Sequence, residues 1–270
     1  MNFKQLITVF IALLIAGQTS AHNRWVLPSH FNLSNDKGEW IMVDVTASNE
    51  TFSVDKPLGA EKLRVIRPNG NIVYPDSGYR GHRKSVVDIH LTDSGTYTLQ
   101  MAGEPSYWTS YKLPGEDKSK WMQANKADRK TKLPKEAHSI VTRSSSTNIV
   151  TYVTLNSPSD NFIFKNEGLE LKPITHPSDI AQGEKAEFTL LFNGKAQADI
   201  EVEITREGVR YRNEPQPLKL TSNKQGVISF TLAQAGRYLL IANHSTAVKD
   251  NPLTDKMAGK LFWTFETALN

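Results

Sequence analysis

The chain has 270 residues, of which 39% are hydrophobic, and a formal net charge of +4 at pH 7. This length suffices for one large or two medium domains, and a small charge excess that reads as spread along the sequence gives no reason to expect a nucleic-acid partner. The sequence contains no cysteine, which excludes disulfides and a lipid anchor on cysteine and leaves stability to a hydrophobic core.

The first 21 residues have the pattern of a secretory signal peptide. Lys4 precedes an apolar run over residues 6–16, which is shorter than the roughly 20 residues that a membrane-spanning helix needs. Thr19-Ser20-Ala21 then forms a small-x-small cleavage site. The sequence therefore predicts a periplasmic protein whose mature chain begins at His22.

Short segments in which apolar and polar residues alternate, separated by Gly, Pro, Asn and Asp, predict β-strands. In the first half of the chain we expect strands near residues 25–27, 40–47, 62–67, 86–91, 97–101, 107–112 and 149–155. Val87, Ile89 and Leu91 share one face of their strand, and Asn69-Gly70 predicts a hairpin turn.

Residues 115–137 interrupt the strand pattern with a segment rich in Lys, Asp, Glu and Ala. We expect a helix over residues 118–128, followed by a charged loop. Four aromatic residues lie in or near this insert: Tyr107, Trp108, Tyr111 and Trp121. We interpret them as core residues and as an anchor for the insert; a platform that stacks on sugars is the alternative.

A cluster of Ser, Pro, Asp and Asn over residues 156–167 predicts a boundary between an N-terminal sandwich, 22–160, and a C-terminal sandwich, 168–270. In the second part we expect strands near residues 169–174, 186–192, 200–205, 226–232, 237–243 and 261–267. The fold class expected is all-β: two β-sandwich units of immunoglobulin-like or Greek-key type, with a small helical or irregular insert in the first.

Four segments carry a family resemblance. They are AHNRWVLP at 21–28, GLELKPITHPSD at 168–179, the stretch from Gly183-Glu184 to Asn193-Gly194-Lys195, and Val209-Arg210-Tyr211-Arg212. Together they resemble the periplasmic family called domain of unknown function 4198, whose members are described as components of cobalt or nickel uptake systems. The resemblance implies a secreted β-sandwich protein that works with an inner-membrane metal transporter, and it implies no set of binding residues.

Histidine is the residue type that best suits a transition metal in this sequence. None of the seven histidines forms a close-spaced pair, so a site must be assembled from distant segments. Cleavage would give His22 an α-amino group, with a pKa of about 7.7–8.0, that joins its imidazole in chelating nickel, cobalt or copper. His176, His244 and His138 are the candidate partners; for each of them a structural or solvated role is the alternative.

Sequence signatures of common hydrolases are absent: there is no G-x-S-x-G, no H-E-x-x-H and no Walker A loop. We therefore expect a non-enzymatic periplasmic protein that binds a transition metal, with no membrane-spanning segment after cleavage. Two alternatives stay open. One is a copper-dependent polysaccharide monooxygenase that uses the mature N-terminal histidine, and the other is a metal-free adhesion or scaffold module.

Overall fold

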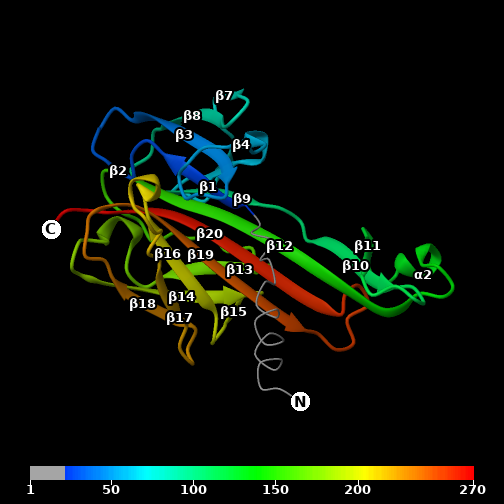
Figure 1. The fold of residues 1–270 in the computed structure, drawn as a ribbon. Coiled ribbons are helices and arrows are strands. Elements are labelled where there is room, and N and C mark those ends of the chain that lie inside the picture. The colour runs from blue at the N-terminus through cyan, green and yellow to red at the C-terminus, as the bar shows by residue number, and fades with distance from the viewer. Residues whose placement is uncertain (1–21) are drawn as a thin grey trace, which may run out of the picture.

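Three β-sheets are stacked in layers in the computed structural model, which describes residues 22–270 (Figure 1). The predicted signal peptide and its cleavage site lie outside the described residues. Within them, no helix combines the length and the apolar character needed to cross a membrane. The chain is all-β, as the sequence predicted.

The N-terminal sheet forms one outer layer, with strand order β1-β3-β8-β7 and with β4 paired to β3. Its strands are β1 (Asn23–Pro28), β3 (Glu39–Ser48), β4 (Lys56–Pro57), β7 (Ser77–Arg80) and β8 (Ser85–Leu91). In β8, Val87, Ile89 and Leu91 are buried and Asp88 is exposed, so the predicted alternation is confirmed.

The central sheet has the order β17-β16-β19-β20-β12-β9-β5-β6, with β2, β10 and β11 attached beside this path. Its strands are β2 (Asn32–Leu33), β5 (Arg64–Ile66), β6 (Ile72–Val73), β9 (Gly95–Ala102), β10 (Ser106–Lys112), β11 (Lys120–Met122), β12 (His138–Leu155), β16 (Glu201–Arg206), β17 (Leu218–Thr221), β19 (Gly236–Ala247) and β20 (Lys256–Thr267). The hairpin predicted at Asn69-Gly70 joins β5 to β6. The long strand β12 pairs in parallel with β20 and antiparallel with β9 and β10.

The C-terminal sheet is the other outer layer. It consists of β13 (Leu169–Pro173), β14 (Lys185–Phe192), β15 (Lys195–Ala196) and β18 (Val227–Thr231). Three short 3-10 helices lie in connections between strands: η1 (Ala60–Lys62), η2 (Pro177–Asp179) and η3 (Val209–Tyr211). All three are single turns.

Alternate residues of the central strands supply two different cores. Leu240 of β19 and Trp263 of β20 pack in the core beneath the C-terminal sheet. Their chain neighbours Leu239 and Phe262 pack in the core beneath the N-terminal sheet. Successive side chains of a strand point to opposite faces, so β12, β19 and β20 are covered on both sides and the two sandwiches share one sheet. The predicted division at residues 160–168 stays a prediction.

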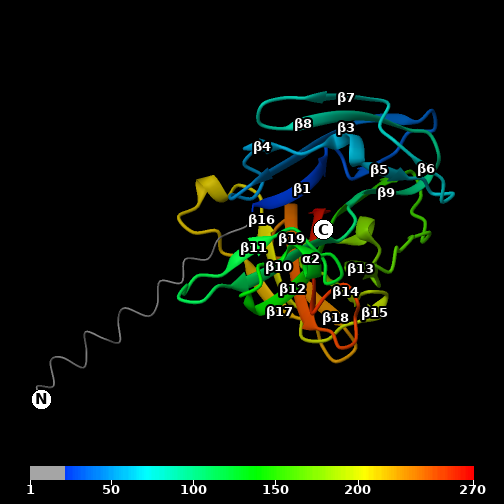
Figure 2. The same cartoon turned by 90° about the vertical axis from the view of Figure 1, so that its right-hand side faces the viewer.

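A projecting arm consists of β10, β11, the short helix α2 (Arg129–Lys132) and the first part of β12 (Figures 1 and 2). The helix predicted over residues 118–128 is wrong: this stretch contains β11, whose Trp121 lies opposite Ser110 of β10, while the helix covers Arg129–Lys132 only. The neighbouring strand offers hydrogen-bonding partners that outweigh a weak helical preference in so short a segment.

Candidate functional site

A cleft of about 450 Å³ opens between the N-terminal sheet and the central sheet, close to the start of the described chain. Arg24 of β1, Lys62 of η1 and Arg80 of β7 bring positive charge to one side of it. The other side is formed by the end of β9, the start of β10 and the middle of β12, including Ser145 and Thr147. The cleft therefore lies where the arm leaves the sandwich.

The three cations of the cleft are not neutralised by direct ion pairs within the described residues. Among residues 22–270, neither Arg24, Lys62 nor Arg80 takes part in an ion pair. The cleft also contains Glu61 and Glu104, and the latter lies 3.8 Å from an ammonium outside the cleft, that of Lys165. Cationic groups that line a cleft without protein partners are available to an anionic ligand.

A further cation lies beside Arg24. Burial lowers the pKa of the Lys260 ammonium, and the positive charge of Arg24 adds to this effect, although Glu203 opposes it. The Lys260 Nζ atom is 4.9 Å from the ring centroid of Phe262. This cation–π contact replaces part of the hydration that the ammonium loses on burial. This part of the molecule thus carries a positive potential.

His22 lies one residue before β1 and is half-buried. From Asn23 onward the chain is paired with β3, with Asn23 opposite Ser48, and Trp25 is fully buried against the ring of Phe52. The strand is therefore anchored immediately after His22. His22 is two residues before Arg24, which lines the cleft.

His176 has a structural role at the junction of the two sandwiches. Its Nδ1 atom accepts from the Ser178 N–H at 3.1 Å, so its proton sits on Nε2. Nε2 lies 3.3 Å from the Ser159 carbonyl oxygen and 3.1 Å from Thr96 Oγ1 of β9. Both ring nitrogens are engaged by the protein, which leaves no lone pair for a metal in this arrangement.

His244 belongs to β19 and lies on the face of the central sheet opposite the cleft. It has the same parity as Leu240, which packs beneath the C-terminal sheet, whereas Lys260 and Phe262 of the cleft side face the N-terminal sheet. Its ring packs edge-on against the ring of Phe192, with the two ring centroids 4.7 Å apart. Burial lowers the pKa of His244. The central sheet therefore separates His244 from His22.

His138 is exposed at the first residue of β12, near the tip of the arm. Its Nδ1 atom lies 3.1 Å from Ser139 Oγ. Thr147, which lines the cleft, is nine residues further along the same strand, or about 30 Å at the usual rise per residue. The structure thus brings none of the three predicted partners to His22, and within the described residues no group of three His, Cys, Asp or Glu side chains is arranged to hold a metal.

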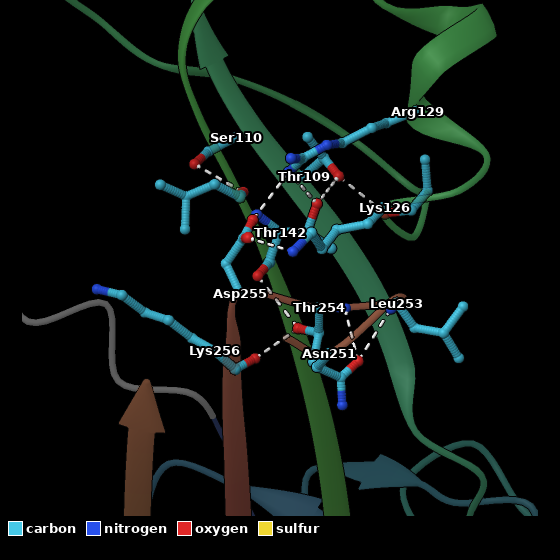
Figure 3. Close-up of polar contacts among 12 residues, drawn as sticks. Thr109, Ser110, Lys126, Arg129, Thr142, Asn251, Leu253, Thr254, Asp255 and Lys256 are labelled. Atoms are coloured by element: carbon cyan, nitrogen blue, oxygen red, sulfur yellow. Dashed lines mark hydrogen bonds and ion pairs between the residues drawn. The ribbon is translucent and has the colours of Figure 1, made fainter. Parts of the chain in front are cut away.

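A polar network holds the arm to the β19–β20 hairpin (Figure 3). Asp255 accepts from the Thr142 N–H at 2.8 Å and pairs with Lys126 and Arg129, each at 2.9 Å. Burial alone would raise the pKa of Asp255, but the hydrogen bonds from Thr142, Lys126 and Arg129 together bring it below its usual value. Thr254 Oγ1 closes the hairpin by donating to the Lys256 carbonyl oxygen at 2.7 Å.

Sequence reasoning did not single out Arg24, Lys62 and Arg80 as functional residues. They come from β1, η1 and β7, and no motif or regular spacing links them. Only the packing of the N-terminal sheet against the central sheet brings them to one cleft. The sequence alone therefore gives no reason to group these three cations.

Comparisons with known proteins give one family and several weak structural similarities. The model of the domain of unknown function DUF4198 matches residues 19–246. No curated protein matches the chain. The D0-D1 domain of intimin is 14% identical, with 90% of this chain and 97% of that chain covered and a TM-score of 0.21.

Two further solved structures show similarities of the same strength. The Yersinia pseudotuberculosis adhesin InvE is 9% identical over 93% of this chain and 61% of that chain, with a TM-score of 0.24. The FN1-FN3 domains of chicken CNTN1 are 6% identical over 91% of this chain and 98% of that chain, with a TM-score of 0.23. At TM-scores of this size they carry no argument about function.

Proposed function

The chain belongs to the DUF4198 family, and from that membership we propose that it is a periplasmic, non-enzymatic protein that binds nickel, cobalt or copper at its processed amino terminus. His22 supplies two donors, the α-amino group and the imidazole. Nitrogen donors suit all three ions, and copper most strongly. An inner-membrane metal transporter is the partner that this role requires.

The position of His22 is the observation that supports the proposal. A frayed chain end disperses its donors, but β1 is anchored to β3 from Asn23 and by the buried Trp25. Because β1 begins one residue after His22, this anchoring limits how far the two donors of the processed His22 can spread. Because the metal displaces the proton of an amine whose pKa is about 7.7–8.0, binding weakens as the pH falls.

The donor set favours capture and release over a closed structural site. The ring nitrogens of His176 are engaged, His244 faces the other side of the central sheet, and His138 lies far along the arm. A bound ion would therefore keep open positions for exchangeable ligands. A monooxygenase of the type considered above needs a second histidine beside the first, and none of these three supplies it.

Calorimetric titration of the processed protein with Ni²⁺, Co²⁺ and Cu²⁺ tests the proposal, after mass spectrometry has established that His22 is the first residue. We expect binding at one site with micromolar or tighter affinity. A variant with one extra alanine before His22 loses the chelating amine, and His22→Ala loses the imidazole; both should bind at least tenfold more weakly. His82→Ala, which removes an exposed histidine elsewhere, is the matched control.

The proposal fails if the alanine-extended protein binds as tightly as the processed one. It also fails if His82→Ala weakens binding as much as His22→Ala. Oxidative cleavage of a polysaccharide by the copper-loaded protein would replace it with the enzymatic alternative.

A further inference from the structure

Positive charge is concentrated in the arm, contrary to the even distribution read from the sequence. Residues 112–143 contain nine Lys or Arg and four Asp or Glu, although the whole chain has a net charge of only +4. The rest of the chain is therefore slightly acidic. Among the described residues, three of these cations form ion pairs, Lys120, Lys126 and Arg129, which leaves the majority of the arm's positive charge facing solvent.

Two tryptophans lie on one face of the arm. Trp121 of β11 is opposite Ser110 of β10, and Trp108 is two residues before Ser110 on the same strand, so both side chains point to the same side. Trp108 is 43% and Trp121 57% exposed. Their interpretation as core residues is therefore wrong, because about half of each large apolar side chain faces water; their interpretation as an anchor for the insert stays a prediction.

Cations continue this face across the neighbouring strands. Trp108 is opposite Arg143 of β12, and Arg143 is opposite Lys256 of β20. Both cations are exposed. Four adjacent strands thus present Trp121, Trp108, Arg143 and Lys256 in a row, which we call the tryptophan row.

The opposite face of the arm is packed and hydrogen-bonded. Thr109 and Thr142 are fully buried there, with their hydroxyls 2.7 Å apart, and Thr109 also donates to the Ala124 carbonyl oxygen. The Asp255 network holds the same side to the β19–β20 hairpin (Figure 3). The tryptophan row is therefore mounted on a rigid support, and a ligand that binds it has little ordering of the arm to induce.

The tryptophan row runs directly into the cleft. Ser106 lies two residues before Trp108, and Ser145 and Thr147 follow Arg143 at alternate positions of β12, so they share its face; all three line the cleft. Arg24, Lys62 and Arg80 stand on the far side. From Val141 to Ile149 this surface extends over about 26 Å of β12, which suits a chain molecule better than a single small one.

We propose that the tryptophan row and the cleft together bind an acidic polysaccharide, one built of uronic-acid units. The tryptophan faces receive the apolar faces of sugar rings, since an aromatic ring offers a large flat apolar surface. The hydroxyls of Ser106, Ser145 and Thr147 match sugar hydroxyls. Arg24, Arg80 and Arg143 receive the carboxylates, and an arginine fork suits a planar carboxylate.

Two features favour a uronic-acid chain over other anionic partners. The cleft is lined by residues of both the N-terminal and the central sheet, and an extended chain can follow it from the tryptophan row to Arg24 more readily than a flat membrane surface can. Glu61 and Glu104 also lie in the cleft, where they repel a densely charged polyphosphate but accept hydrogen bonds from sugar hydroxyls. Sparse carboxylates separated by hydroxyls are the chemistry that this mixed lining complements.

Titration of the full processed chain with oligogalacturonate, in a buffer that contains a metal chelator, tests the proposal separately from metal binding. A neutral cello-oligosaccharide of the same length is the ligand control. We expect oligogalacturonate to bind and the neutral chain to bind at least tenfold more weakly. Added salt should weaken the binding, because part of it is electrostatic.

Two variants test the site itself, and a third serves as the control. Trp108→Ala combined with Trp121→Ala, and separately Arg143→Gln, should weaken oligogalacturonate binding by about tenfold. Trp40→Ala is the control, because Trp40 is 54% exposed on the outer face of the N-terminal sheet. Thermal unfolding of each variant checks that the fold is intact.

Three results would overturn the proposal. The first is equal affinity for the acidic and the neutral chain. The second is a loss of binding in Trp40→Ala as large as in the double tryptophan variant. The third is binding to vesicles of anionic phospholipid, sensitive to the double tryptophan substitution, with no binding of oligogalacturonate.

Discussion

The two faces of the central sheet differ in what covers them. Toward the C-terminal sheet, Trp263 is fully buried and packs on Phe265 and Phe188, with ring centroids 4.2 and 4.6 Å apart. Toward the N-terminal sheet, the cover ends partway along β12 and leaves the cleft and the tryptophan row. The same strands thus use one face for stability and leave part of the other for the proposed binding surface.

Trp263→Ala is expected to have the largest effect on stability. It leaves a cavity among fully buried aromatic rings, and such substitutions cost about 3–5 kcal/mol. Urea unfolding followed by circular dichroism measures the loss. A cost below about 1 kcal/mol would show that the core beneath the C-terminal sheet is less tightly packed than the structure indicates.

Asp255→Asn is expected to cost about 1–2 kcal/mol, since hydrogen bonds to a charged acceptor are lost while the shape is kept. Its effect should depend on pH. The folded pKa of Asp255 is lowered, so its contribution is fully present above the unfolded value of about 3.9 and is lost as the pH falls through the folded value. Urea unfolding should therefore show the wild type more stable than the variant at pH 7, and the two curves should converge only when the pH falls below the folded pKa of Asp255.

His244→Gln tests how pH affects the face of the central sheet that the C-terminal sheet covers. Because burial lowers the pKa of folded His244, the unfolded chain binds the proton first when the pH falls below about 6.5, and the fold loses stability. We expect the variant to lose less stability than the wild type on acidification from pH 7 to pH 5. His138→Gln, the same substitution at an exposed position, is the matched control.

Trp108→Ala should have the smallest effect on stability, within about 0.5 kcal/mol, as is usual at exposed positions. Trp108→Ala and Trp263→Ala make the same substitution on the two faces of the central sheet, so their stability losses can be compared directly. A loss of several kcal/mol at Trp108 would mean that this face belongs to the core. The urea midpoint and the slope of the transition distinguish the two cases.

Much of the fold was predictable from local sequence patterns. The alternation at Val87, Ile89 and Leu91 and the Asn69-Gly70 turn are short-range signals, and the structure confirms both. The parallel pairing of β12 with β20 joins residues more than a hundred positions apart, and nothing local specifies it. The helix over residues 118–128 failed for a different reason, because β11 pairs with β10, a strand that lies outside that stretch.

The candidate site was less predictable than the fold. His22 was identified from the cleavage pattern, but Arg24, Lys62 and Arg80 meet only after two sheets have packed. The tryptophans were noticed in the sequence and assigned to the core, because Trp and Tyr bury large areas in sandwiches. Which face of β10 stays uncovered depends on where the N-terminal sheet ends, and that is a property of the assembled molecule.

The place of β20 has a consequence for the order of folding. β20 (Lys256–Thr267) lies between β12 and β19 in the central sheet and is the last strand of the described residues. The central sheet therefore cannot close until β20 has been made. Pairing of segments so distant in sequence also slows folding. Because synthesis starts at the amino terminus, β12 is made long before the partner that completes its pairing.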